Sequence, residues 1–150
     1  MASYDSVGQN YQDNFGNYRA AVAKSVALTA TGNAVVALPI LGGGVGPNGA
    51  YILRRITVSN PANIAGGTVP SFASCNVSIT TSNDGNASNA VAAAQTIANV
   101  TAVNTYQDLT LASSTVTTAA TASVLFLNVN AGAVANGSVT VSVYADVVNF

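Results

Sequence analysis

The C-terminal stretch SVTVSVYADVV, residues 138–148, decides the fold class because its side chains change character at every second position. One set is apolar and consists of Val139, Val141, Val143, Ala145 and Val147. The intervening set is mostly polar and consists of Ser138, Thr140, Ser142, Tyr144 and Asp146. A period of two places each set on its own face of an extended chain. The stretch therefore predicts a β-strand that packs one face against a core.

Similar patterns recur upstream in six further segments, separated by residues that favour turns. The predicted strands cover residues 25–31, 34–41, 51–59, 75–81, 106–112 and 122–130. Ala87–Val103 is either a short helix or an eighth, weakly patterned strand, and we favour a strand. Turn chemistry such as Asn136–Gly137 suits antiparallel neighbours, and no βαβ rhythm appears. We predict an all-β chain, folded over residues 25–150 as an antiparallel, jelly-roll-like β-sandwich.

Charged residues are scarce, at 6% of the 150 residues, where an ordinary domain has about 25%. Four cations and a net charge of -1 predict no nucleic-acid partner, because duplex binding needs several Lys or Arg set against phosphates. No apolar run approaches the roughly 20 residues that span a membrane, and the polar N-terminus does not resemble a secretory signal. The single Cys75 excludes an intrachain disulfide framework. We therefore expect synthesis and folding in a cytoplasm, with no membrane partner.

The residue types that most enzymes use for proton transfer are missing. The chain has no His and no Glu, and its five acids are Asp residues scattered along the sequence. Hydroxyl and thiol groups therefore have no imidazole to activate them, and we predict that the protein is not an enzyme. The alternation around Cys75 places this residue in the core beside Val77 and Ile79.

Two segments match ligand-binding motifs only in part. Gly44–Gly49 has the spacing G-x-G-x-x-G, but a strand pattern follows where a dinucleotide-binding helix would begin. From Asp84 onward, oxygen-bearing side chains stand at alternate positions, but Asn89 and Gln95 replace the Gly and Glu of an EF-hand. We predict a loop for the first segment and a turn for the second, with no metal and no cofactor.

Residues 1–24 differ from the rest and are predicted to form an N-terminal arm. Spacings of three or four residues align one set of side chains on a single side of a helix: Tyr4, Val7, Tyr11, Phe15, Tyr18 and Val22. Glycines and many Asn residues disfavour an isolated helix, so the arm is expected to order, as helix or extended chain, against another surface. That surface is its own domain or a neighbouring chain, and we favour the neighbour. The predicted interface residues are Tyr4, Tyr11, Phe15, Tyr18 and Arg19.

Arg54 and Arg55 lie in the middle of the predicted strand 51–59. Strict alternation sends one guanidinium to each side of the sheet and places Arg54 on the face of Ile52, Ile56 and Val58. A buried Arg needs a carboxylate or several carbonyl groups. The two arginines therefore form either an internal pair, for example with Asp108 or Asp146, or a contact between subunits.

The overall layout resembles the small β-sandwich capsid decoration (cement) proteins of tailed bacteriophages. The resemblance is carried by the aromatic arm, by strands rich in Ala, Val, Thr, Ser and Asn, and by segments such as 51–61 and 138–148. It implies a structural virion protein on the exterior of the capsid, made in the host cytoplasm. Its partners would be the major capsid protein and further copies of itself, often in a trimer. The arm would then reach a neighbouring subunit or the capsid lattice.

A head or tail fibre or receptor-binding module of a phage is the alternative, since it would share the β-rich composition. A sugar-binding lectin or a hydrolase is disfavoured because the chain lacks His, Glu and Trp.

Overall fold

The computed structural model describes residues 18–32, 35–39, 49–116 and 118–149. The described residues form eight strands and no α-helix. The strands are β1 (Tyr18–Ala27), β2 (Val35–Pro39), β3 (Gly49–Asn63), β4 (Asn76–Thr80), β5 (Ala90–Thr96), β6 (Tyr106–Asp108), β7 (Val124–Ala131) and β8 (Gly137–Asn149). A 3-10 turn, η2 (Ala87–Asn89), precedes β5.

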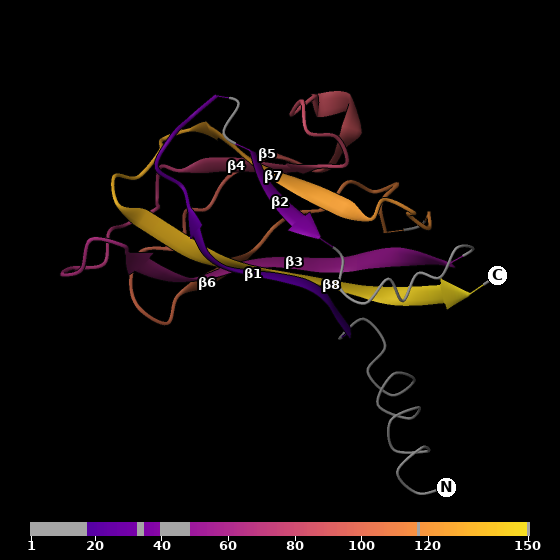
Figure 1. The fold of residues 1–150 in the computed structure, drawn as a ribbon, viewed down its shortest axis with the longest axis horizontal. Helices are drawn as coiled ribbons and strands as arrows, with labels where there is room; N and C mark the ends of the chain where they lie inside the picture. The colour runs from indigo at the N-terminus through magenta and orange to yellow at the C-terminus, as the bar shows by residue number, and fades with distance from the viewer. Residues whose placement is uncertain (1–17, 33–34, 40–48, 117, 150) are drawn as a thin grey trace, which may run out of the picture.

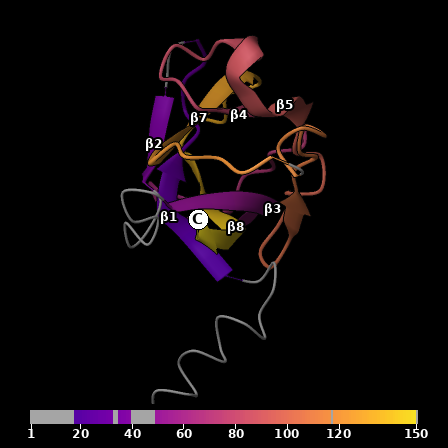
Figure 2. The same ribbon diagram turned by 90° about the vertical axis from the view of Figure 1, so that its right-hand side faces the viewer.

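The strands make two four-stranded antiparallel sheets that face each other, as Figures 1 and 2 show. Sheet A has the order β1-β8-β3-β6, and sheet B has the order β2-β7-β4-β5. The first strand pairs with the eighth, the second with the seventh, the third with the sixth and the fourth with the fifth. A long hairpin wrapped around one core produces this pairing, and it is the arrangement of a double-sheet jelly roll. The predicted all-β, jelly-roll-like sandwich is confirmed.

The core lies between the sheets and is built by the alternation that the sequence displays. In β8, Val139, Val141, Val143 and Ala145 are buried, whereas Thr140 and Tyr144 remain partly accessible on the outer face. The opposite layer supplies side chains such as Leu125 and Leu127 from β7, which are fully buried. Burying one such aliphatic side chain contributes roughly 1.5–3 kcal/mol. These two faces together account for the stability of the sandwich.

Tyr51 is the largest side chain in the core and keeps its polar end satisfied. It is 1% exposed, and its hydroxyl donates a hydrogen bond of 2.5 Å to the carbonyl oxygen of Ala122. Burial raises the pKa of this phenol to about 12. A buried hydroxyl without a partner would destabilise the fold, so this bond matters to the position of β3 against the chain that leads into β7.

The first strand begins earlier than predicted. Residues 18–24, assigned to the end of the arm, form most of β1, and the strand ends at Ala27 instead of continuing to residue 31. Of the two conformations expected for the arm, Tyr18 and Val22 adopt the extended one and not the helix, since both belong to this strand. β1 has register shifts after Arg19 and after Ala23. Because of these shifts its inward residues do not fall at every second position, and the sequence shows no period of two there.

The ambiguous segment Ala87–Val103 resolves into more than one element. It starts with η2 and continues as β5, so the favoured strand is confirmed for Ala90–Thr96. Asn86 caps η2, because its side-chain oxygen accepts a hydrogen bond of 3.0 Å from the amide of Ser88. The other strand predictions are confirmed with shifted ends: β3 continues past the predicted residue 59 to Asn63, and β6 stops at Asp108 instead of residue 112.

Candidate functional site: the cationic face of sheet A

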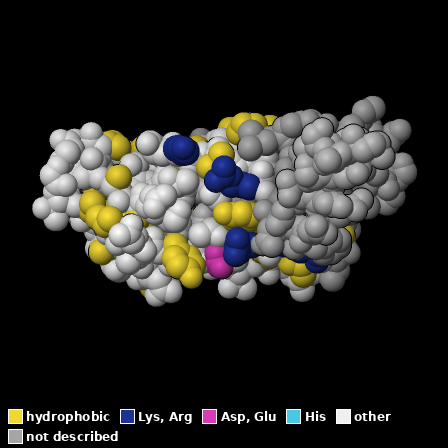
Figure 3. Space-filling view, turned by 90° about the horizontal axis from the view of Figure 1, so that it is seen from below, with side chains coloured by type: hydrophobic (Ala, Val, Ile, Leu, Met, Phe, Trp, Pro, Cys, Tyr) yellow, Lys and Arg dark blue, Asp and Glu magenta, His cyan; other side chains and the backbone are white. Residues whose placement is uncertain are grey.

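All four Lys and Arg residues of the chain lie on the outer face of one sheet. We call this surface, made by the outward side chains of sheet A, the cationic face. Its cations are Arg19 and Lys24 from β1 and Arg54 and Arg55 from β3. Figure 3 views the molecule from this side and shows the blue cations gathered on it. The four cations are the chain's whole supply, so the face is strongly asymmetric in charge.

Strand pairing aligns part of this face into a row. Arg19 of β1 stands opposite Tyr144 of β8, and Arg55 of β3 stands opposite the same tyrosine from the other side. Directly paired residues in an antiparallel sheet point to the same face. The topology therefore places Arg19 and Arg55 on either side of Tyr144, although more than 120 positions of sequence separate Arg19 from Tyr144.

Arg55 lies over the ring of Tyr144, with its guanidinium carbon 4.2 Å from the ring centroid. This distance is well within the range of a cation–π contact, which contributes about 0.5–1 kcal/mol at an exposed site. The contact fixes the guanidinium over the ring, and Arg55 remains exposed to solvent there. The predicted residue Arg55 is thus part of a stacked surface pair.

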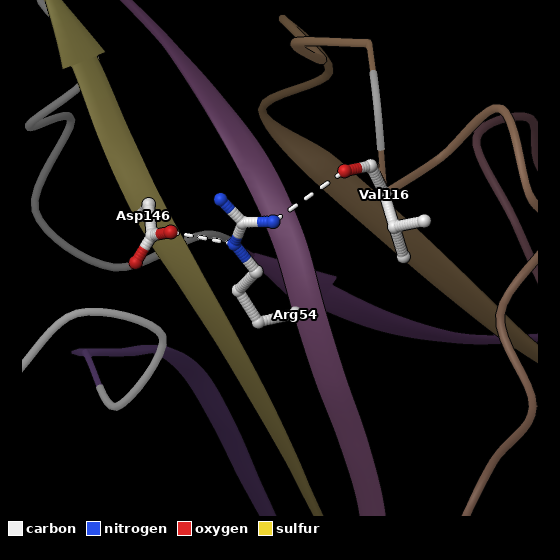
Figure 4. Close-up of polar contacts among 3 residues, drawn as sticks. All are labelled: Arg54, Val116 and Asp146. Atoms are coloured by element: carbon white, nitrogen blue, oxygen red, sulfur yellow. Dashed lines mark hydrogen bonds and ion pairs between the residues drawn. The ribbon is translucent and has the colours of Figure 1, made fainter.

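Arg54 forms the internal pair that was one of its two predicted roles. Its Nε donates to Oδ2 of Asp146 over 2.5 Å, and Nη1 donates to the carbonyl oxygen of Val116 over 3.5 Å, as Figure 4 shows. The Asp146 side chain is only 7% exposed, whereas that of Arg54 is 34% exposed. The ion pair therefore neutralises a carboxylate that the sheet would otherwise shield from water.

A β-bulge overturns the prediction that the two arginines face opposite sides of the sheet. The register of β3 against β8 shifts between Leu53 and Arg55, so both arginines are exposed. Before the shift Leu53 points inward, and after it Ile56 points inward. Arg54 accordingly does not share the buried face of Ile56. An extra residue in one strand reverses the phase of everything that follows it.

Small hydroxyl side chains fill the middle of the face, between the cations. Val22, Ser142, Thr57 and Asp108 form a second row across the four strands. Thr57 Oγ1 donates a hydrogen bond of 2.5 Å to Oδ1 of Asp108, so Asp108 does not serve as the partner of an arginine in the way considered from sequence. Tyr106, at 62% exposure, stands beside this row on β6.

The charges on the face do not cancel. Its four cations stand against two acids, Asp108 and Asp146, which leaves a net charge of +2 from 4 − 2. Arg19, Lys24 and Arg55 make no ion pair with any acid that the structure describes. Because opposite charges at an interface guide and align partners, such a face fits an acidic surface.

The structure tests the predicted interface residues unequally. Arg19, Arg54 and Arg55 come together on the cationic face, whereas Tyr4, Tyr11 and Phe15 lie outside the described residues. Tyr18 opens β1 next to Arg19. Sequence reasoning did not select Tyr144, although it is the only aromatic side chain at an outward position of the alternating strand 138–148.

The remaining candidate sites have structural roles or lie outside the described chain. Cys75 is fully buried beside Val77 and Ile79 as predicted, and burial raises the pKa of its thiol to about 11. The Asp84 segment is the predicted turn: Asp84 accepts hydrogen bonds from the Ser82 hydroxyl and the Asn86 amide. These bonds, led by that from Ser82, lower the pKa of Asp84.

The described residues contain no cluster of three or more metal-ligating side chains. Residues 44–48 of the glycine-rich motif fall outside the described part of the chain, and the last residue of the motif, Gly49, begins β3. Within the described chain, no helix has the length and apolar character to cross a membrane. No protein-family model matches the sequence, and no curated protein or solved structure matches it significantly.

Proposed function

We propose that this chain is a structural virion protein, a capsid decoration (cement) protein that binds the outside of a phage head as a homo-oligomer. One observation carries the proposal: every Lys and Arg of the chain lies on the outer face of one jelly-roll sheet, interleaved with hydroxyl side chains. A broad sheet face of this composition suits contact with another protein surface. We assign the cationic face to contacts between neighbouring subunits in the assembly.

The rest of the chemistry supports an assembly role. Interfaces favour Arg and Tyr over Lys, and the cationic face carries three arginines with Tyr106 and Tyr144. Jelly rolls occur in viral capsid domains, although a fold by itself hosts many functions. A repeated lattice also makes modest contacts sufficient, because linked contacts raise overall affinity without any single strong one. In this proposal the major capsid protein provides that lattice, and three copies of the chain form the decorating unit.

The same face supports a second candidate, a fibre or receptor-binding module. Tyr106 is 62% exposed, and Tyr144 holds a stacked arginine nearby on the same sheet. Exposed tyrosines beside hydrogen-bonding hydroxyls suit the recognition of sugars, and jelly rolls also occur among lectins. A glycan array separates the two candidates, since specific hits that Tyr106→Ala abolishes would favour the receptor-binding module.

Particle binding tests the decoration proposal directly. Purified protein is added to heads assembled from the matching major capsid protein without this chain, and bound copies are counted by mass spectrometry and imaging. We expect saturable binding in a fixed ratio to the capsid subunit, with density on the outer surface. Absence of the protein from purified virions, together with failure to bind such heads, would refute the proposal.

A further inference from the structure

The cationic face has more positive charge than its own acids neutralise, and the other three acids of the chain lie in two separate segments. Asp84 lies in the connection between β4 and β5 of sheet B, where Ser82 and Asn86 hold it. The two remaining acids are Asp5 and Asp13. Both belong to residues 1–17, which contain no Lys or Arg. This segment therefore brings two carboxylates and neither Lys nor Arg to an interface.

We infer that residues 1–17 of a second copy bind to the cationic face. This inference rests on the proposed function, in which copies of the chain assemble, and it names the partner of that face. Two carboxylates on the segment complement the net charge of +2 on the face. The aromatics Tyr4, Tyr11 and Phe15 supply the rigid apolar groups that stack on arginine and fill the spaces between cations.

The dimensions of the face and of the segment agree. Arg19 and Lys24 are five residues apart along β1, which corresponds to about 17 Å at ~3.3 Å per residue. Arg55 lies two strands away from Arg19, about 10 Å across the sheet. Seventeen residues extend to about 56 Å, so one segment is long enough to contact cations at both ends of the face.

The direction of β1 favours a second copy over the same molecule. Tyr18 is the first residue of β1, and its neighbour Arg19 already marks one end of the cationic face. A chain that kept the direction of the strand before Tyr18 would run beside residues 146–149 of β8, away from Arg19 and Lys24. It would reach the cations of its own face only by turning back, whereas the face of an adjacent copy requires no such reversal. Mutual exchange of segments then closes a symmetric oligomer.

A double-mutant cycle in the full chain tests the contact. Association of the purified protein is measured by sedimentation equilibrium at 0.1 M salt for the parent, for Asp5→Asn with Asp13→Asn, for Arg55→Gln, and for all three changes together. We expect the pair Asp5→Asn and Asp13→Asn on the segment to weaken association about two- to fivefold, typical of an exposed ion pair. We expect Arg55→Gln on the face to weaken it by a similar factor. Combining them should weaken it by clearly less than the product of the two effects. Multiplicative effects would overturn the inference.

The control carries the same change in net charge at another place. Ala93→Asp lowers the charge by one, as Arg55→Gln does, on an exposed position of β5 in sheet B. We expect this variant to associate like the parent protein. An equal loss for Ala93→Asp and Arg55→Gln would assign the effect to net charge and refute a specific contact. Raising the salt to 1 M, where the screening length is about 3 Å, should abolish the coupling in the cycle.

Cross-linking identifies which copy supplies the segment. One preparation carries Gln12→Cys on the segment, another carries Thr140→Cys on the face, and the two are mixed before treatment with a bismaleimide. We expect a cross-linked pair containing one chain of each kind. A chain bearing both changes that cross-links only within itself, or a mixture that yields no pair, would overturn the inference.

The outcomes separate this inference from the proposed function. If the cycle shows multiplicative effects and no mixed cross-link forms, yet the protein binds heads in a fixed ratio, the segment contact is wrong and the decoration role stands. If the protein assembles with the expected coupling and the mixed cross-link, yet binds no heads, the decoration role is wrong and the segment contact stands.

Discussion

Gly132, just after β7, lies against the backbone that leads into β4, and replacing it tests how tightly these two neighbouring strands of sheet B pack at their ends. Its φ is +64°, and a Cβ added there would stand 2.1 Å from the carbonyl oxygen of Ser74. The backbone around Ser74 has little freedom to move, because the amide of Cys75 donates to Phe72 and its carbonyl accepts from Ile97, at 2.8 and 2.9 Å. Gly132→Ala therefore meets both an unfavourable dihedral angle and a steric clash.

The magnitude follows from these two contributions. A left-handed conformation costs a residue with a Cβ about 1–2 kcal/mol, and overpacking adds about 1–3 kcal/mol. We expect Gly132→Ala to lower the free energy of unfolding by about 2–5 kcal/mol. Gly66→Ala is the matched control, because Gly66 has a φ of +83° but nothing within 4 Å of an added Cβ. Gly66→Ala should lower the free energy of unfolding only by the cost of the left-handed conformation, about 1–2 kcal/mol.

Urea denaturation followed by circular dichroism measures both variants. A chain of this size loses about 2–4 °C in Tm for each kcal/mol, so thermal melts provide a second comparison of the two. The slope of the urea transition should stay at the parent value. A lower urea concentration at the midpoint then reports a lower free energy of unfolding. Equal losses for Gly132→Ala and Gly66→Ala would refute the reasoning, since the close approach to Ser74 would then carry no energy.

Three further predictions concern the core and the ion pair. Tyr51→Phe loses the hydrogen bond to Ala122 and should cost about 1 kcal/mol in urea unfolding. Because the pKa of Tyr51 is raised to about 12, its hydroxyl contributes stability below pH 10 that is lost as the pH rises through 12. The phenylalanine variant should show a shallower alkaline decline, and an unchanged decline would contradict this. Cys75 has a pKa raised to about 11 from 9.0, so its thiolate fraction at pH 8 and its rate of labelling by a thiol reagent should be about 100-fold lower than in urea; equal rates would place it at the surface. Arg54→Gln and Asp146→Asn should each cost about 1 kcal/mol, and the double variant should cost less than their sum, whereas simple additivity would show that the pair contributes nothing.

The sequence predicts strands well where alternation is uninterrupted. Residues 138–148 lie within β8, and the apolar set is buried as predicted through Ala145. In the polar set Thr140 and Tyr144 are partly accessible, whereas Ser138, Ser142 and Asp146 are also buried. β1 was harder to predict, because Ala20 and Ala21 are both buried and a register shift separates Arg19 from Ala21. Two adjacent buried residues erase the period of two, and the aromatic spacing further upstream then favours a helix.

The candidate site was predictable in its members but not in its geometry. The scarcity of cations singled out Arg19, Arg54 and Arg55 as residues that need an explanation. Their position on one face depends on the bulge in β3 between Leu53 and Arg55. It also depends on the place of β8 between β1 and β3 in sheet A. Neither feature has a local sequence signature, because pairing between distant strands is set by the closure of the whole sandwich. For the same reason Tyr144 could not be assigned to a row with two arginines.

The pairing of β1 with β8 also determines when the chain can complete its fold during synthesis on the ribosome. β8 is the sole neighbour of β1 in sheet A and the second neighbour of β3, so the sheet stays incomplete until residues 137–149 have been synthesised. Contacts across so much of the chain slow folding to the range of milliseconds to seconds. A nascent or prematurely terminated chain would therefore expose unpaired strands with few charges to guard them, which makes it a substrate for chaperones or proteases. Only a chain that includes residues 137–149 covers the facing edges of β1 and β3, so a chain cut before β8 cannot complete sheet A.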